Sequence, residues 1–126
     1  MAARFRKGRA FLAGDAAHVN NPLGGLGLNF GIHDAIELSD LLGRVISREA
    51  PSRTLDLYDQ NRRRLNLEYV QRQTIDNKKR MEEKDPKVRT TNFEALRNIA
   101  ADPMAHRAYL LRASLIESVR STPPDG

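Results

Sequence analysis

The sequence predicts a mainly helical fold of about four helices, with one short β-strand near the N-terminus. The strand is expected at residues 10–14, an apolar run of strand length that Gly14-Asp15 ends. Most of the chain after residue 27 instead repeats apolar residues at intervals of three and four, the period of an amphipathic helix. Asp85-Pro86 and Asp102-Pro103 interrupt that repeat, because proline is well tolerated only in the first turn of a helix. One strand cannot form a sheet, so we expect it to pair with structure outside this chain or to be recruited into another element.

The first helix is expected from about Gly27 to Arg48, because the residue before Pro51 disfavours helical backbone. Asp34 falls on another face from most of the apolar residues. It could face the side of a bound ligand, but we expect it at the helix surface or acting on the helix dipole in the first turn. The apolar residues that lie close to one face are Leu28, Ile32, Ala35, Ile36, Leu42 and Ile46.

A second helix is expected to begin near Ser52 or Thr54, either of which is a suitable cap, and to extend to about Lys84. Arg62 falls on its apolar stripe. The other members of that stripe are Leu55, Tyr58, Leu65 and Tyr69. We divide the chain accordingly into a strand-loop-helix segment, residues 1–51, and a helical region, residues 52–126, of a single or partial domain.

Two further helices are expected near the C-terminus. Thr91-x-x-Glu94 matches a capping box ahead of an apolar run. Asp102 is a suitable cap for a last helix that begins with Pro103. The apolar stripe of that helix consists of Met104, Ala108, Leu111, Leu115 and Val119. The tail, residues 121–126, is expected to fray.

The composition describes a chain able to bury a core. It has 126 residues, of which 40% are hydrophobic and 29% charged, and a chain of this size buries roughly two thirds of its unfolded surface. No apolar run approaches the roughly 20 residues needed to span a bilayer, so no membrane partner is expected. The absence of cysteine excludes disulfides and thiolate metal sites, and it fits the cytoplasmic location that we expect.

The net charge is +5, and two basic clusters, Arg62–Arg64 and Lys78–Arg80, lie on the second expected helix. They are separated by about 24 Å of helix. Such clusters can bind nucleic acid phosphates. Only Tyr69 lies between them, however, so a solvated helix face is the better interpretation and no nucleic-acid partner is expected.

Four glycines, Gly24, Gly25, Gly27 and Gly31, fall where the first helix is expected to begin. Glycine weakens a helix interior by about 1 kcal/mol relative to alanine. The cluster therefore indicates a backbone that needs positive φ or that passes close to a ligand. A Walker-type phosphate loop fits poorly, because no lysine follows the glycines.

Nucleophile and metal chemistry have little support in the sequence. No Gly-x-Ser-x-Gly elbow occurs. His18, His33 and His106 lack metal-ligand spacing, so we expect them to be structural or exposed.

A series of markers follows the expected strand: Gly14-Asp15-Ala16-Ala17-His18, Pro22, Gly24-Gly25, Gly27-Leu28-Asn29 and Asp34-Ala35. This series resembles the second FAD-binding motif of the flavoprotein aromatic hydroxylases, the FAD-dependent monooxygenases of the para-hydroxybenzoate hydroxylase type. The resemblance implies that the chain is a C-terminal piece of an α/β, Rossmann-like fold that binds FAD and NAD(P)H. It also implies hydroxylation of a phenolic or related aromatic substrate with FAD, O2 and NADH or NADPH.

The resemblance implies a role for each marker. Asp15 would hydrogen-bond a ribityl hydroxyl of FAD, and Pro22 would lie by the flavin ring near the substrate. The amides of Leu28 and Asn29 would point at the flavin N1 and C2 carbonyl. The glycines that would let the backbone pass close to FAD are Gly14, Gly24, Gly25 and Gly27. The resemblance assigns no catalytic side chain and no metal ligand to this chain.

The chain also departs from the family pattern. Nothing before residue 10 resembles the βαβ unit with Gly-x-Gly-x-x-Gly that binds the ADP half of FAD. We therefore expect the chain alone to bind FAD weakly and to be inactive. The alternative is a non-catalytic helical remnant or assembly module that pairs with itself or with a complementing N-terminal chain. A helical fragment without its sheet is expected to expose its apolar faces, above all Leu28, Ile32 and Ile36 with the Phe11-Leu12 strand.

Overall fold

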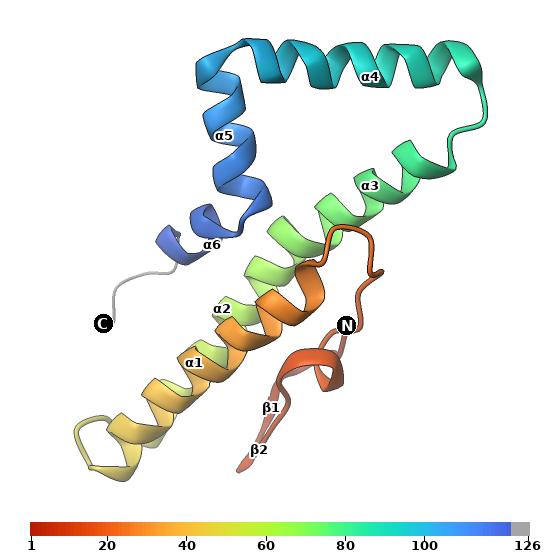
Figure 1. Cartoon of the computed structure of the whole chain (residues 1–126). Coiled ribbons are helices and arrows are strands. Elements are labelled where there is room, and N and C mark those ends of the chain that lie inside the picture. The colour runs from red at the N-terminus through yellow and green to blue at the C-terminus, as the bar shows by residue number, and fades with distance from the viewer. Residues whose placement is uncertain (122–126) are drawn as a thin grey trace. The chain divides into compact units, whose positions relative to one another are not determined.

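The computed structural model describes residues 1–121 and is mainly helical, as the sequence predicts (Figure 1). The chain divides into two compact units, Met1–Thr74 and Ile75–Gly126. Each unit is described by itself. The frayed tail predicted for residues 121–126 lies, beyond residue 121, outside the described residues.

The N-terminal strand belongs to a small hairpin. Strand β1, Arg6–Lys7, pairs antiparallel with β2, Ala10–Phe11, and Arg6 lies opposite Phe11. A two-residue turn closes the hairpin, which is the shortest common connection between antiparallel strands. The expectation of a lone strand that needs a partner from outside the chain is therefore wrong. The partner is the basic segment just before it, whose polar sequence gave no strand signal.

The short 3-10 helix η1, Gly14–Ala16, follows the hairpin, and α1, Leu26–Ile46, follows a loop. The side chains that α1 buries are Leu26, Phe30, Asp34 and Leu41. The predicted surface position of Asp34 is thus wrong, because the buried face is the one that carries Phe30. The opposite stripe behaves as expected, since Leu28, Ile32 and Ile36 are 76%, 49% and 62% exposed.

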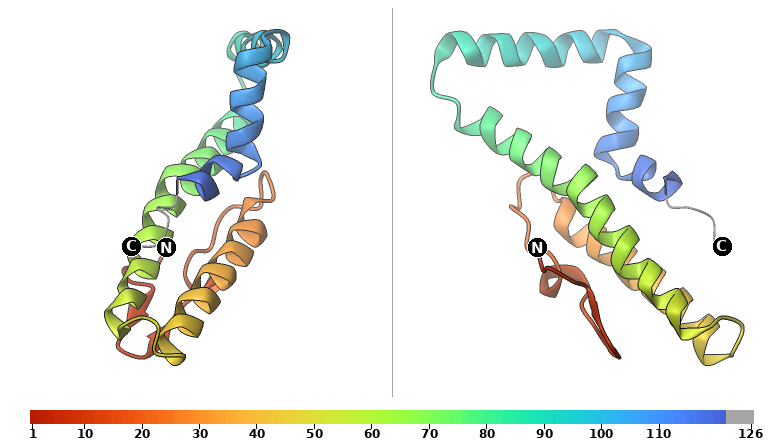
Figure 2. Two further views of the ribbon diagram at one scale, coloured as in Figure 1. Left: turned by 90° about the vertical axis from the view of Figure 1, so that its left-hand side faces the viewer. Right: turned by 180° about the vertical axis from the view of Figure 1, so that it is seen from behind.

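A continuous helical segment follows where the sequence predicts the second helix (Figure 2). It consists of η2, Ser52–Leu55; α2, Asp56–Leu65; a π-helical stretch η3, Asn66–Gln71; and α3, Arg72–Glu82. Helices α1 and α2 pack side by side (Figures 1 and 2). The core of the first unit consists of Phe5, Ala17, Leu41, Leu55 and Tyr58.

The helices that lie wholly in the second unit are α4, Pro86–Ala101; α5, Pro103–Ala113; and α6, Ile116–Arg120. Asp102 caps α5 as predicted, since its side chain accepts hydrogen bonds from the first-turn amides. Helix α4 begins earlier than predicted, because Asp85 caps it and Pro86 takes the first position. The capping box predicted at Thr91-x-x-Glu94 is wrong, and both residues lie inside α4. None of the helices in residues 1–121 is long and apolar enough to cross a membrane.

Candidate functional site

The glycine turn leads directly into α1. The Gly25 N–H donates to the Pro22 carbonyl over 3.0 Å, and Gly25 is the N-cap of the helix with φ 65°. A residue with a side chain is strained at this φ, although a Cβ there would meet no atom of the described chain within 4 Å. The glycine is therefore required by backbone conformation, and the space in front of the helix is open.

The start of α1 presents unpaired backbone donors. No side chain among the described residues caps this end. The first N–H groups of an α-helix have no partner within the helix, and here they belong to Leu26, Gly27 and Leu28. The Asn29 side chain turns back instead and donates to the Gly25 carbonyl over 3.0 Å. The result is an exposed helix N-terminus whose donors and dipole favour an anionic or electron-rich group.

Asp15 lies in η1 with an exposed side chain. That side chain forms no hydrogen bond or ion pair within residues 1–121, so its carboxylate is available to accept from a ligand. Pro22 and Gly24 are exposed as well.

The turn that carries Asp15 lies directly against α1. A Cβ built on Gly31 would lie 3.0 Å from the Gly14 Cα, which is tighter than most Cβ contacts in proteins. The two backbones therefore touch at a Gly14–Gly31 contact. Gly31 is four residues, about 6 Å of helix, beyond Gly27. The structure thus brings the predicted site residues Gly14 and Asp15 close to the predicted residues at the start of α1.

Behind these exposed groups, Asp34 is the centre of a buried polar cluster. Its Oδ1 accepts from the Arg62 Nε over 2.7 Å. Its Oδ2 accepts from the Gly14 backbone N–H over 2.9 Å and from the His18 Nε2 over 2.5 Å. The side chains of Asp34, His18 and Arg62 are 0%, 0% and 2% exposed. The sequence prediction missed this cluster, except that His18 has the structural role expected of it.

Burial and the charges of the cluster shift the pKa values of its two carboxyl groups, Asp34 and the neighbouring Glu37. Burial raises the pKa of Asp34, but hydrogen bonds from His18, Arg62 and Gly14 outweigh it and hold that pKa below its ordinary value. Burial raises the pKa of Glu37 above its ordinary value, against the opposing attraction of Arg62. Asp34 is therefore ionised at neutral pH and pairs with the Arg62 guanidinium.

Arg62 also contacts Phe30 of α1. Its guanidinium carbon lies 3.9 Å from the centre of the Phe30 ring, and its Nη2 donates to the Phe30 carbonyl over 3.2 Å. This burial removes Arg62 from the solvent-exposed surface. The cluster Arg62–Arg64 is therefore not a continuous basic stripe, which weakens the nucleic-acid interpretation.

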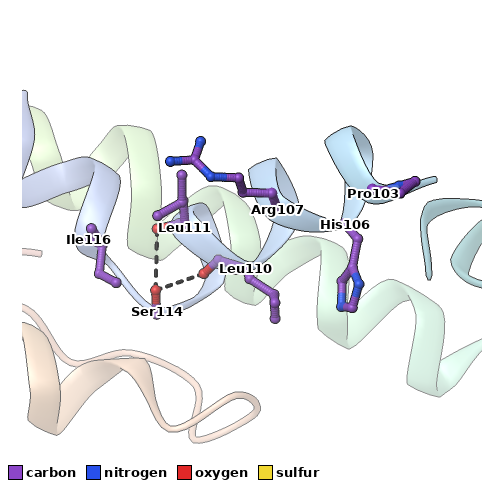
Figure 3. Close-up of a pocket in the computed structure, with 7 residues that line it drawn as sticks. All are labelled: Pro103, His106, Arg107, Leu110, Leu111, Ser114 and Ile116. Atoms are coloured by element: carbon purple, nitrogen blue, oxygen red, sulfur yellow. Dashed lines mark hydrogen bonds between the residues drawn. The ribbon is translucent and has the colours of Figure 1, made fainter. Parts of the chain in front are cut away.

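The second unit carries a hollow of a different kind. It has a volume of about 470 Å³ and lies beside α5 and α6 (Figure 3). Its lining residues are Pro103, His106, Arg107, Leu110, Leu111, Ser114 and Ile116. The Ser114 hydroxyl donates to the backbone carbonyls of Leu110 and Leu111, over 2.7 and 3.4 Å, so it serves the helix end and is not placed as a nucleophile. We assign no chemistry to this hollow.

Comparison with known proteins places the site in a family. Residues 1–73 match the model of the family described as "FAD binding domain". The chain is 42% identical over 110 residues to the para-nitrophenol 4-monooxygenase of Pseudomonas sp. (strain WBC-3), which covers 87% of this chain and 27% of that protein. It is 50% identical over 62 residues to the anhydrotetracycline monooxygenase of Streptomyces rimosus, covering 49% of this chain and 12% of the relative.

Among solved structures, the p-nitrophenol 4-monooxygenase PnpA from Pseudomonas putida DLL-E4 superposes with a TM-score of 0.82 at 39% identity, over 89% of this chain and 29% of that one. The chain thus spans between about a tenth and a third of the length of these relatives. FAD is the cofactor that the family description names, and the open helix start and unpaired Asp15 carboxylate suit its flavin and ribityl parts. Because the match covers more than half of its residues, the chain belongs to the FAD binding domain family.

Proposed function

We propose that this chain supplies the flavin and ribityl part of the FAD site of a monooxygenase that hydroxylates a phenolic or related aromatic substrate. The observation that best supports this is the uncapped start of α1, with its left-handed Gly25, beside the exposed turn of Asp15. We assign the cofactor to residues 1–51 and a supporting helical role to residues 52–126. O2 and NADH or NADPH would be the other reactants of the whole protein.

FAD, when bound, supplies the electron-transfer and oxygen chemistry. The Asp15 carboxylate accepts a hydrogen bond from a ribityl hydroxyl. The Leu28 and Asn29 amides face the flavin N1 and C2 carbonyl, and Pro22 lies by the ring near the substrate. Gly14, Gly24, Gly25 and Gly27 let the backbone pass close to the cofactor.

The electrostatics of α1 support this arrangement. A helix N-terminus favours negative charge by about 0.3–1 kcal/mol when exposed, and by up to about 2 kcal/mol when partly buried. A hydrogen bond to a charged group contributes roughly 1.5–3 kcal/mol. Since α1 has no acidic residue in its first turn, no side-chain charge there competes with a ligand. These contributions favour a reduced flavin that carries negative charge on the ring edge next to the helix.

The aromatic substrate class rests on the names of the relatives. They are monooxygenases of para-nitrophenol, anhydrotetracycline and 4-methyl-5-nitrocatechol, which share an aromatic ring bearing oxygen substituents. We extend to this chain only that shared ring chemistry.

A second candidate is an assembly role, and the exposed stripe of Leu28, Ile32 and Ile36 favours it. Three large apolar side chains on one helix face are typical of a surface that contacts protein. In this role the stripe packs against a polypeptide that carries the remainder of an FAD site, or against a second copy of the chain. The two candidates share Leu28, whose backbone amide is assigned to the cofactor and whose exposed side chain belongs to the stripe.

Titration of the chain into FAD, followed by quenching of flavin fluorescence, tests the cofactor proposal. We expect saturable quenching, and the affinity should fall about tenfold or more in Asp15→Ala because the hydrogen bond that the charged carboxylate accepts is lost. Asp40→Ala removes an exposed carboxylate of α1, away from the Asp15 turn, and serves as the matched control. Quenching that is absent, or equal in both variants, contradicts the proposal.

Light scattering of the chain with and without Ile32→Glu tests the assembly role. A chain that is monomeric at every concentration would contradict that role.

A further inference from the structure

The Asp34 carboxylate joins three segments that are distant in sequence. Asp34 belongs to α1. Its carboxylate oxygens accept hydrogen bonds from the Gly14 backbone N–H, from the imidazole of the loop residue His18, and from the guanidinium of Arg62 on α2. Each donor approaches within 2.9 Å. Because a buried carboxylate needs all of these donors to remain ionised, its position fixes theirs.

The His18 ring lies between Asn20 and Asp34. The Asn20 Nδ2 donates to the His18 backbone carbonyl over 3.2 Å and lies 3.1 Å from the His18 Nδ1. On the other side of the ring, Nε2 lies 2.5 Å from the Asp34 Oδ2. Asn20 and Asp34 therefore hold the imidazole from both of its nitrogens.

These contacts extend to the first turn of α1. The Cβ of Asn20 lies 3.8 Å from the position of a Cβ on Gly27, which is ordinary van der Waals contact. Asn20, His18 and Asp34 thus connect the start of α1, the loop before it and the turn of Gly14 in one set of contacts. The Gly14–Gly31 contact joins the same turn directly to α1.

We propose that Asp34 is a positioning residue of the flavin site, which holds the Gly14–Asp15 turn in register with the open start of α1. Asp34 is buried and touches no cofactor group itself. It acts through Gly14, whose neighbour Asp15 is exposed, and through His18 and Asn20 beside Gly27. This inference rests on the proposed function, since the two groups held in register are those assigned to the ribityl chain and the flavin ring.

The test compares Asp34→Asn and Asp34→Glu with two controls in the same 126-residue chain. Asp40→Asn changes an exposed carboxylate of α1, and Leu65→Ala removes a buried side chain of α2 outside the cluster, so it lowers stability without touching Asp34. Asp34→Glu keeps the charge but displaces the carboxylate by about 1.5 Å, the length of one carbon–carbon bond. FAD affinity is measured from flavin fluorescence at a temperature where circular dichroism shows each variant folded.

We expect both Asp34 variants to lose about tenfold to a hundredfold in FAD affinity, as when a hydrogen bond to a charged group is lost. Leu65→Ala should bind FAD within about twofold of the wild type despite its lower melting temperature. Affinity within about twofold of the wild type in both folded Asp34 variants, or a loss in Leu65→Ala equal to theirs, overturns the proposal, because either result shows Asp34 to act through stability alone.

A measurement on the unmodified chain needs neither variant nor FAD. The Gly14 amide should be protected from hydrogen exchange and shifted downfield, as expected for a donor to a buried carboxylate, whereas the exposed Gly24 should exchange freely. A Gly14 amide that exchanges as fast as Gly24 overturns the proposal even if both Asp34 variants fail to fold. A wild-type chain with a protected Gly14 that never quenches FAD overturns the proposed function instead, and the two failures are thereby distinguished.

Discussion

Residues 1–74 and residues 75–121 are both mainly helical, but they differ in how many side chains their helices bury. The first unit surrounds Asp34, Arg62 and an apolar core with α1 and α2. In the second, no residue of α4 or α5 is buried in the described chain, and Phe93 and Met104 are 57% and 79% exposed. The FAD binding domain family matches residues 1–73, which coincide with the unit that has a core. The proposed cofactor site thus lies in the closely packed unit, whereas α4 and α5 depend mainly on local interactions.

The caps of α4 and α5 show what those local interactions are. Asp85 accepts from the Lys87 amide over 2.8 Å, and Asp102 accepts from the Met104 and Ala105 amides over 2.8 and 3.2 Å. Each cap is followed by proline at the first helical position. Substitutions in the two units should therefore differ in size and in what they disturb.

The largest effect is expected from Arg62→Met, which leaves the Asp34 carboxylate buried without its guanidinium. Breaking a buried ion pair in this way costs about 3–5 kcal/mol of the free energy of unfolding. Urea unfolding followed by circular dichroism measures it. Arg64→Met is the control, because Arg64 pairs with Glu68 over 3.3 Å where both side chains are 46% exposed, and such pairs contribute about 0.3–0.5 kcal/mol. Equal losses in the free energy of unfolding would show that the buried Arg62 contributes no more to stability than the exposed Arg64.

A matched pair of leucines compares the units directly. Leu41 is 3% exposed in the first unit, and Leu110 is 52% exposed in the second. Leu41→Ala should lower the free energy of unfolding by about 3 kcal/mol through lost burial and a cavity, and Leu110→Ala by less than about 0.5 kcal/mol. A loss from Leu110→Ala as large as that from Leu41→Ala would show that the second unit has a core as well.

Acid should weaken the first unit through Asp34. The pKa of this carboxyl is lower in the folded chain, so the unfolded chain takes up the proton first as pH falls. Its contribution to stability is fully present above pH of about 4 and is lost as pH falls through the lower folded pKa. Glu37 has the opposite sign, because burial raises its pKa and protonation favours the folded chain.

Urea midpoints measured between neutral pH and strong acid should therefore fall most steeply below pH of about 4. Asp34→Asn should flatten that decline, and Glu37→Gln should make it begin at higher pH. A pH dependence unchanged by Asp34→Asn would show that other carboxylates cause acid unfolding.

The Gly14–Gly31 contact allows a comparison within one helix. Alanine is favoured over glycine inside a helix by about 1 kcal/mol, and Gly43 has open space around it in the described chain. Gly43→Ala should therefore stabilise α1, whereas Gly31→Ala forces its methyl group against the Gly14 backbone and should destabilise it. Thermal unfolding should separate the two variants by about 2 kcal/mol. A gain in stability from both would show that the two backbones separate at little cost.

The smallest effect belongs to the second unit. Asp102→Ala should cost α5 about 1 kcal/mol, the usual value of a helix cap. Faster hydrogen exchange of the Met104 and Ala105 amides would report it, with global unfolding little changed. Glu94→Ala is the control, because Glu94 lies inside α4 and caps nothing there. Faster exchange at the start of a helix in Glu94→Ala would restore the capping-box interpretation.

The sequence predicted correctly the features that depend on neighbouring residues alone, such as helix caps, helical periodicity and glycine turns. Asp102-Pro103, the helical period after residue 27 and the glycine turn all lie where the sequence places them. The start of α4 was predicted wrongly. Asp85-Pro86 can end one helix or begin the next, and the prediction used it only as the end of the second helix. The hairpin was missed because β1, Arg6–Lys7, is polar and only two residues long, too short to show apolar alternation.

The Asp34 cluster could not be found from neighbouring residues. Asp34 meets partners 16, 20 and 28 positions away, and no periodicity links those distances. One signal was present: Asp34 follows Phe30 by four residues and precedes Leu41 by seven, so it shares their helix face. A carboxylate on such a face needs buried donors, and Arg62 on the apolar stripe of the second helix was the matching residue.

The contact between Asp34 and Arg62 also limits how this site can be transplanted. The recognisable motif ends at Ala35, yet the guanidinium that balances its carboxylate is supplied by α2. A graft of residues 14–35 into another scaffold would carry a buried negative charge without its counter-ion. The smallest portable form of the proposed flavin site therefore extends from residue 14 through Arg62, more than twice the length of the sequence pattern.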